Sequence, residues 1–283
     1  MGKKSYRLST FLSQPIDVVE VNAYNPKMGY SAIIFGLVGA ASGSFLNVCI
    51  DRLPERQSLL RPPSHCPACQ RRIAIKDLIP VFSYLWLRGH CRYCRAPIPK
   101  RVLWVELGTG LLFAFLWWRY GLAPELGIMI FYLCLLIIIF VIDLERGVIL
   151  NRVVYPAAVI ALIIAAFTSI TGVFTSNPGI VRVLIGGGVG LVIMLLLSLI
   201  YRGGIGMGDV KMAGLVGLLT GFPLVLVSLF LAVVSGGLVA MVLLLLKIKQ
   251  RKQTIPFGPF LSLGAMVTLL WGASILDWYR QLF

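Results

Sequence analysis

Long apolar stretches dominate this sequence, and they constrain its fold more than any other feature. Of the 283 residues, 58% are hydrophobic and only 13% are charged, whereas a soluble domain carries roughly a quarter charged residues. Several stretches run for about 20 residues with few or no charges, which is long enough for a helix to cross about 30 Å of hydrocarbon. The sequence therefore predicts an all-α polytopic membrane protein.

We expect about eight transmembrane helices. The expected spans are 29–50, 102–120, 124–142, 153–172, 180–201, 211–222, 224–246 and 256–275. The sixth span is short, because about 12 residues cover only ~18 Å as a helix. Four domains follow from these spans: an N-terminal extracytoplasmic segment (1–28), a first span (29–50), a cytoplasmic loop domain (51–101) and a membrane core of spans two to eight (102–283).

The distribution of basic residues predicts the orientation in the membrane. The net charge is +15, and 19 of the 26 lysines and arginines fall in alternate connections between spans, at 51–101, 143–152, 202–211 and 247–255. The positive-inside rule places these connections in the cytoplasm and both termini outside it. Because the basic residues cluster between spans, and form no arginine stripe interleaved with aromatic residues, we expect a lipid bilayer and no nucleic acid as the partner of this charge.

Four cysteines in the loop domain have the spacing of a metal site. Cys66 and Cys69 are separated by two residues, as are Cys91 and Cys94, and 21 residues lie between the pairs. Two such turns can place four thiolates around Zn²⁺, and four sulfur ligands leave no open position, so the role is structural. The alternative is two disulfides or free thiols, and disulfides are disfavoured in a reducing cytoplasm.

Two aspartates lie at the ends of predicted spans, where aspartate is rare. Asp143 ends the third span, and Asp209 follows Gly206 and Gly208 just before the sixth. A carboxylate pair can hydrolyse a peptide, because one ionised group takes a proton from water while its protonated partner polarises the scissile carbonyl. The two glycines would let backbone approach a substrate and relieve the turn into the sixth span. Either aspartate alone is equally consistent with a helix cap or a solvated side chain.

Several other residues have simpler interpretations. His65 and His90 flank the cysteine pairs, and we expect them not to be ligands. Glu106 lies a turn inside the second span, where a carboxylate needs a partner; it pairs with Arg101 or has a functional role. The glycine cluster at 186–190 is expected to allow close packing of two helices.

At this point the motifs resemble those of a known family, the type IV prepilin peptidases. These enzymes are bacterial membrane aspartic proteases of the GxGD type. The matching motifs run in order along most of the chain: ASGSFLNVCIDRLP, the paired cysteines around DLIPVFSYLWLRGHC, VELGTGLLF, IDLERGVILN, GMGDVK and IPFGPFLSLGA. The expected fold, from the spans and the cysteine spacing, is about eight transmembrane helices with a cytoplasmic zinc-binding loop domain between the first and second spans, and the resemblance likewise implies a cysteine-rich cytoplasmic loop.

The resemblance also implies an activity. Such enzymes cleave type IV prepilins or pseudopilins after a glycine that ends a short basic leader, at the cytoplasmic face of the inner membrane. Many then methylate the new N-terminus with S-adenosylmethionine. The carry-over places the catalytic pair on Asp143 and Asp209, with Gly206, Gly208 and Lys211 completing the motif. The family's cysteine-rich loop maps onto the four cysteines of the loop domain.

Two details of this resemblance are specific to the chain. Many members carry a Pro-Asp pair where this sequence has Leu150 and Asn151. Spacing identifies no ligands for S-adenosylmethionine, so that site must be built from the loop domain and the span ends.

A basic leader also requires an acidic recognition patch; the candidates are Asp51, Glu55, Asp77 and Glu145.

Three other functions are compatible with the residues alone. A transporter would use the two aspartates to relay protons, but it predicts symmetry-related interrupted spans that the sequence does not show. An adaptor would organise pilus assembly through the zinc loop and tolerate loss of either aspartate. A methyltransferase without proteolysis would tolerate that loss too. The sequence specifies neither the particular pilin nor the oligomeric state.

Overall fold

The computed structural model describes residues 26–61, 63–171, 179–200, 206–246 and 256–282, and the regular elements within them are helices. Of the expected N-terminal segment, residues 1–25 lie outside this description. The long helices are α1 (Pro26–Arg52), α3 (Lys100–Tyr120), α4 (Pro124–Arg146), α5 (Asn151–Thr171), α6 (Ile180–Ile200), α7 (Met207–Thr220), α8 (Leu224–Leu245) and α9 (Gly258–Gln281). The loop between α1 and α3 carries a short 3-10 helix, η2 (Ile75–Leu78), and a short helix, α2 (Phe82–Trp86).

Each of the eight expected spans corresponds to one of these long helices. Among the described residues, seven helices are long and apolar enough to cross a membrane. The exception is α7, which has 14 residues and therefore extends only about 21 Å. The prediction of an all-helical polytopic protein with a short sixth helix is confirmed. The short helix is enclosed by its neighbours, since nine of its residues are buried.

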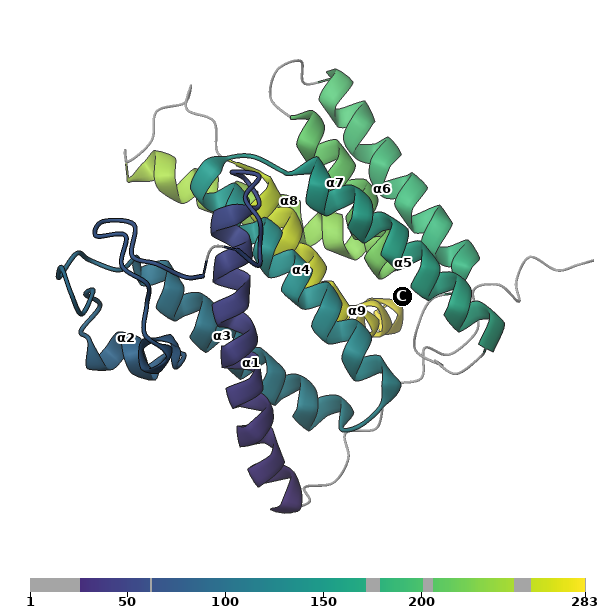
Figure 1. The fold of residues 1–283 in the computed structure, drawn as a ribbon. Helices are drawn as coiled ribbons and strands as arrows, with labels where there is room; N and C mark the ends of the chain where they lie inside the picture. The colour runs from purple at the N-terminus through teal and green to yellow at the C-terminus, as the bar shows by residue number, and fades with distance from the viewer. Residues whose placement is uncertain (1–25, 62, 172–178, 201–205, 247–255, 283) are drawn as a thin grey trace, which may run out of the picture.

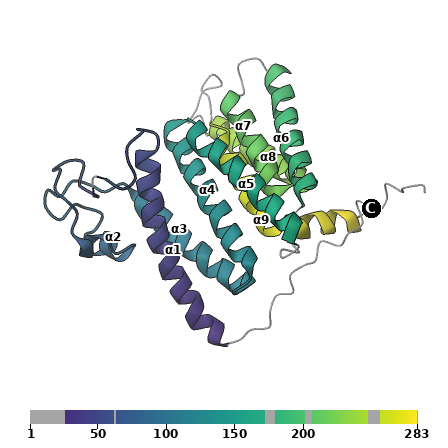
Figure 2. The same cartoon turned by 45° about the vertical axis from the view of Figure 1, so that its right-hand side comes forward.

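The helices form two groups that meet along α4 (Figures 1 and 2). The first group is the pair α1 and α3, together with the cysteine-bearing loop, and the second contains the helices from α4 to α9. Their junction is apolar, with Leu46 and Ile50 of α1, Val105 of α3, and Val141 and Ile142 of α4 buried together. The first group is thus packed directly against the C-terminal half of α4.

Glycines allow α6 and α7 to approach each other closely. A Cβ atom at Gly186 would overlap the backbone of Gly217 and Gly221, and one at Gly190 would overlap the Ala213 carbonyl oxygen. A Cβ at Gly188, in contrast, would meet no atom within 4 Å. The expected packing role of the cluster is confirmed for the positions that face α7, where small residues let two membrane helices come into backbone contact.

Several helix ends gather at one end of the second group, and this end holds the candidate site. The C-terminus of α4 and the N-termini of α7 and α9 all lie at this end (Figure 1). Proline at the start of α9 suits the first turn of a helix, whose backbone N–H groups have no partner within the helix. The fold therefore brings together residues that lie more than one hundred positions apart in the sequence.

Candidate functional site

Asp143 lies inside α4, three residues before the helix ends at Arg146. The side chain is buried, and its Oδ2 atom accepts no hydrogen bond from any described residue. Gly258, the first residue of α9, lies against the carboxylate, because a Cβ atom added there would overlap Oδ2. The carboxylate therefore faces the N-terminus of α9, where the helix dipole favours negative charge.

Asp209 is the third residue of α7, so it lies inside the helix and not before it as the sequence suggested. The backbone N–H of Gly206 donates a hydrogen bond to its Oδ2 atom at 3.2 Å. This bond is the one that an acidic side chain makes in the first turn of a helix. The capping role considered from the sequence is therefore present. It uses only the Oδ2 atom of Asp209, so Oδ1 takes no part in the cap.

The structure brings the two aspartates together. The Asp143 carboxylate lies against Gly258, and Asp209 directly follows Gly208, so the surroundings of these two glycines relate the aspartates to each other. Ile149, in the connection from α4 to α5, lies close to both glycines: a Cβ atom added at Gly208 would be 3.2 Å from Ile149 Cβ, and one added at Gly258 would be 3.1 Å from Ile149 Cδ1. The site is thus formed by the end of α4, the connection that follows it, and the first turns of α7 and α9.

One of the two roles expected for the glycines of the GMGD motif, relief of the turn into the helix, is contradicted by their backbone angles, while the approach of backbone to a substrate stays a prediction. Gly206 has φ −73° and ψ 148°, which any residue can adopt, and Gly208 is not among the glycines with positive φ. The expected relief of a strained turn is therefore wrong. A Cβ at Gly208 would come within 3.2 Å of Ile149 Cβ, so this glycine allows the close approach of a neighbouring segment.

Lys211 points away from the aspartates. Its Nζ atom donates a hydrogen bond to Asn151 Oδ1 at 3.2 Å and lies 5.6 Å from the centre of the Tyr155 ring. Residues two apart on a helix face different directions, which is why Lys211 contacts α5 while Asp209 faces the site. Asn151 is one of the residues that departs from the family pattern, and its amide oxygen accepts this bond.

The four cysteines form a single cluster. The Sγ atoms of Cys66, Cys69, Cys91 and Cys94 all lie within 4.8 Å of one another, and those of Cys66 and Cys94 are 3.7 Å apart. Tetrahedral zinc with Zn–S bonds of about 2.3 Å requires sulfurs roughly 3.8 Å apart. Backbone N–H groups of Cys94 and Tyr93 lower the pKa of the Cys91 thiol, whereas burial and the neighbouring thiols raise the pKa of Cys94, so the support for a metal site is the geometry of the four sulfurs. The cluster can hold a metal ion.

The two cysteine pairs have the same backbone geometry. In the first, the Cys66 N–H bonds to the Arg71 carbonyl oxygen and Gln70 has φ 58°. In the second, the Cys91 N–H bonds to the Ala96 carbonyl oxygen and Arg95 has φ 57°. The loop domain therefore contains two equivalent turns, each supplying two thiols to the same point.

The neighbouring histidines lie outside this cluster, as expected from the sequence. The Nδ1 atom of His65 is 3.2 Å from the Pro63 carbonyl oxygen, and that of His90 is 2.7 Å from the Arg88 carbonyl oxygen. Neither ring joins the group of potential ligands. Four sulfurs complete the coordination sphere without them.

Arg101 connects the loop domain to the segment that carries Asp143. Its guanidinium donates to Glu145 Oε2 at 2.8 Å and to Asp51 Oδ1 at 2.7 Å. A second ion pair joins Arg146 to Glu55 at 3.1 Å. The end of α1, the start of α3 and the last turn of α4 are therefore held together by charged groups beside the candidate site.

The four acidic residues considered for leader recognition are all paired with arginines of the chain. Asp51, Glu55 and Glu145 belong to the ion pairs just described, and Asp77 accepts two hydrogen bonds from Arg92 Nε at 2.9 and 3.0 Å. The hydrogen bond from Arg92 lowers the pKa of Asp77 below its usual value. A basic leader would have to compete with these internal partners, so the acidic patch stays a prediction.

The partner of Glu106 differs from the one suggested by the sequence. Glu106 is buried, and its Oε2 atom accepts a hydrogen bond from the Val81 backbone N–H at 2.8 Å. Arg101 was the expected partner, but its guanidinium is bound by the two other carboxylates. The expected ion pair is therefore wrong, because Glu106 lies more than a helical turn beyond Arg101 along α3.

Sequence reasoning missed the contribution of Gly258 and Ile149 to the site. Gly258 is followed by Pro259 at the start of an apolar stretch, a pattern that predicts the first turn of a helix. That pattern predicts where the helix begins, but it does not predict which other segment the start of the helix contacts. Contacts between α9 and the end of α4 emerge only from the packing of the helices.

The fold and the site define a polytopic membrane protein with two aspartates at helix ends, one buried and one half-buried, and a separate four-thiol cluster. Two family models match the chain, "Bacterial Peptidase A24 N-terminal domain" over residues 37–120 and "Type IV leader peptidase family" over residues 130–241. No solved structure matches it.

Curated relatives match the chain over most of its length. Two proteins named "Prepilin leader peptidase/N-methyltransferase", from Stutzerimonas stutzeri and Bacillus subtilis (strain 168), are 32% and 29% identical to it. The matches cover 93% of this chain and 98% of the first relative, and 88% of this chain and 96% of the second. The chain belongs to the type IV leader peptidase family, and the resemblance predicted from its motifs is confirmed.

Proposed function

We propose that the protein is a membrane aspartic endopeptidase that removes the basic leader from type IV prepilins or pseudopilins, cutting after the leader glycine. One observation carries this proposal: the Asp143 carboxylate lies against Gly258 at the start of α9, and Ile149 lies close both to Gly258 and to Gly208, the residue before Asp209. Family membership and the names of the relatives support the same substrate class.

The chemistry follows from two neighbouring carboxyl groups with different charges. Two such groups cannot both ionise cheaply, so one proton is shared between them. The ionised member accepts a proton from water as the oxygen attacks the scissile carbonyl, while the protonated member donates a hydrogen bond to the carbonyl oxygen. Collapse of the tetrahedral intermediate breaks the C–N bond, and a proton passes to the leaving amine. Gly208 and Gly258, which have no side chain, allow Ile149 and the Asp143 carboxylate to approach closely and so shape the site.

We infer that the protein also methylates the new N-terminal amine of the pilin. When bound, S-adenosylmethionine would supply the methyl group: the N–C bond would form as the S–CH3 bond breaks, S-adenosylhomocysteine would leave, and the amine would lose a proton. The relatives' names include this activity.

We propose that the metal of the four-cysteine cluster is structural zinc. The support is the all-sulfur donor set, the short distances between the thiols and the two equivalent turns. Coordination by four thiolates leaves no position for water or substrate. Zinc would therefore fix the loop domain and take no part in peptide hydrolysis.

The proposed location is the bacterial inner membrane, with the site facing the cytoplasm. Seven apolar helices support a multi-pass protein. The excess of lysine and arginine in the connections at the site's end of the molecule supports the cytoplasmic orientation.

The experiment that tests the function is mass spectrometry of a full-length prepilin incubated with the purified protein, with and without S-adenosylmethionine. We expect a product that begins directly after the leader glycine, and an added methyl group only when S-adenosylmethionine is present. Absence of cleavage across several pilin and pseudopilin substrates would rule out the peptidase and favour the transporter or adaptor.

Replacing a cysteine of the cluster tests the metal proposal. We expect Cys91→Ser to weaken zinc binding at least about a hundredfold, because even residues outside the coordination sphere contribute ten- to a hundredfold. The measurement is zinc content of the purified protein by atomic absorption, with thermal unfolding in parallel. Cys134→Ser, which removes a thiol outside the cluster, is the matched control and keeps its zinc. Unchanged zinc in Cys91→Ser would disprove the assignment.

A further inference from the structure

The loop domain exposes a continuous group of large apolar side chains. We call residues 79–86, which include α2, the interfacial segment. Phe82 is 66% exposed, Leu85 is 60% exposed and Trp86 is 83% exposed. Exposed apolar groups of this size on a water-soluble loop usually mark a binding surface, and the segment lies outside the candidate active site.

A hydrogen bond places this segment beside the membrane-crossing part of α3. The Val81 backbone N–H donates to Glu106 Oε2 at 2.8 Å, and Glu106 is 4% exposed. Glu106 is six residues past Lys100, where α3 begins, which is about 9 Å along the helix axis. The whole of α3 extends only about 31 Å, close to the hydrocarbon thickness. The interfacial segment therefore lies at the depth of the first turns of α3, at the end of the span next to the loop domain.

The arrangement of the helices agrees with this depth. In both overall views α2 lies alongside α1 and α3 and not beyond the cytoplasmic end of α1 (Figures 1 and 2). A loop domain that extended only into the cytoplasm would lie beyond that end.

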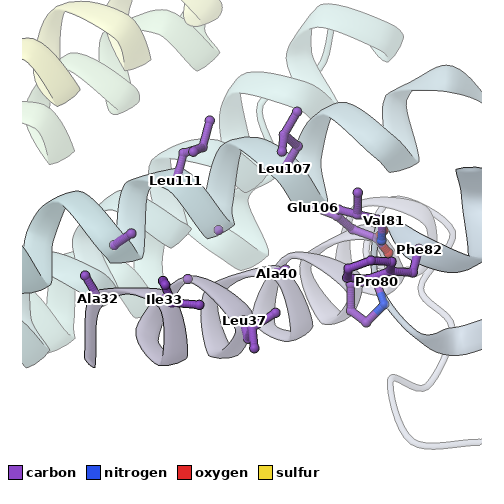
Figure 3. A pocket seen from close by; sticks show the side chains of 13 residues that line it. Ala32, Ile33, Leu37, Ala40, Pro80, Val81, Phe82, Glu106, Leu107 and Leu111 are labelled. Carbon is purple, nitrogen blue, oxygen red and sulfur yellow. The ribbon is translucent and has the colours of Figure 1, made fainter. Parts of the chain in front are cut away.

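An apolar groove joins the interfacial segment to the lipid-facing surface of the two helices. Pro80, Val81 and Phe82 form one end of the groove (Figure 3). Its sides include Leu37 of α1 and Leu111 of α3, which are 58% and 64% exposed. Exposed leucines in the middle of membrane spans contact lipid, so the same medium extends along the groove to Phe82.

The backbone of residues 80–83 is suited to an apolar medium, in which every N–H needs an internal partner. Pro80 has no N–H, Val81 donates to Glu106, and Phe82 donates to the Pro80 carbonyl oxygen. Ser83 donates to the Ile79 carbonyl oxygen at 3.0 Å. Val81 has φ 63°, which is rare for a β-branched residue and turns its N–H toward Glu106.

Charge at the two ends of the segment matches the surface of a bacterial membrane. Lys76 precedes the segment and Arg88 follows it, and both side chains are exposed. Basic residues beside an apolar group are attracted to anionic headgroups, and tryptophan favours the boundary between headgroups and acyl chains. The observations therefore indicate a lipid surface, and not an acidic protein, as the partner.

We propose that residues 79–86 insert into the cytoplasmic leaflet and anchor the loop domain to the bilayer surface. Phe82, Leu85 and Trp86 enter the region between headgroups and acyl chains, while the cysteine cluster stays on the aqueous side. The hydrogen bond to Glu106 fixes the segment to α3. This anchor is independent of the proposed peptidase activity, because it requires only that the helices cross a membrane.

Fluorescence quenching by brominated lipids tests the anchor. The full-length protein is placed in nanodiscs of phosphatidylethanolamine and phosphatidylglycerol, with or without bromine on the acyl chains. The emission of Trp86 is obtained by subtracting the tryptophan emission of Trp86→Phe from that of the wild-type protein. Trp86→Phe is a conservative change at an exposed ring. We expect brominated lipid to lower this emission at least about twofold, since tryptophan at the interface contacts acyl chains.

A tryptophan on the aqueous side provides the matched control. Gln57→Trp adds one beside Glu55 and Arg56, beyond the end of α1, where Gln57 and its neighbours are exposed. Its added emission should be unchanged by brominated lipid and quenched by acrylamide in solution. The proposal is overturned if Trp86 behaves like this control. It is also overturned if added prepilin protects Trp86 from brominated lipid, since the segment would then bind the substrate helix.

Discussion

Replacing either Asp143 or Asp209 with asparagine is expected to abolish cleavage of a prepilin, with a loss of at least about a thousandfold, because general acid–base catalysis typically contributes 10²–10⁴. Asparagine keeps the size of the side chain but can neither accept a proton from water nor share one with its partner. The measurement is the initial rate of leader removal by each purified variant, with the cleaved pilin quantified by mass spectrometry.

The double variant and an unrelated aspartate define how this result is interpreted. Residues that act as one unit have strongly non-additive effects, so Asp143→Asn combined with Asp209→Asn should lose no more activity than either single change. Asp277, near the end of α9, pairs with Arg280 at 3.7 Å, and Asp277→Asn should keep wild-type activity. Cleavage that persisted in both single variants would remove these residues from the catalytic mechanism.

The hydropathy pattern predicts most of this fold because a membrane allows few alternatives. Each apolar stretch of about 20 residues has to become a helix that crosses the bilayer. The helix α7 is shorter than that, and it is stable because α6 covers it through Gly186 and Gly190. The sequence shows the glycines and the short stretch separately, while their contact depends on how the helices pack.

The candidate site was predictable in its residues but not in its surroundings. Asp143 and Asp209 stand out because a carboxylate at a span end is costly and therefore rare. The wrong partner for Glu106 shows the limit of this reasoning, since sequence proximity favoured Arg101 whereas the structure supplies a backbone N–H from a loop 25 residues away. Backbone groups carry no sequence signal, so such partners appear only in three dimensions.

The ion pairs around Arg101 relate the loop domain to the candidate site in space. Asp51 belongs to α1, Arg101 to α3 and Glu145 to the turn after Asp143. The Arg101 side chain is 13% exposed, but those of Asp51 and Glu145 are 56% and 40% exposed, and ion pairs with solvent-exposed partners contribute little to stability. The pairs therefore indicate that the base of the loop domain lies beside the last turn of α4, which carries Asp143.

Replacing Gly258 with alanine is expected to reduce kcat/KM for leader removal at least about a hundredfold, because a displacement of about 1 Å in a catalytic group can cost that much. The new Cβ would overlap Asp143 Oδ2 and lie 3.1 Å from Ile149 Cδ1. The carboxylate can rotate to relieve the overlap, so we expect the protein to remain folded while the carboxylate leaves its position opposite Asp209.

A second glycine separates this effect from a general effect of alanine in a membrane helix. Gly237 lies in α8, and a Cβ atom there would meet no atom within 4 Å. Gly237→Ala should therefore keep full activity and unfold at the same temperature or slightly higher, because alanine favours a helix by about 1 kcal/mol over glycine. Thermal unfolding of both variants, measured alongside cleavage, distinguishes a displaced carboxylate from a damaged fold. If Gly258→Ala cleaved as fast as Gly237→Ala, the carboxylate beside Gly258 would not be the catalytic group, and Asp143 would lose its proposed role even though the fold around it stayed intact.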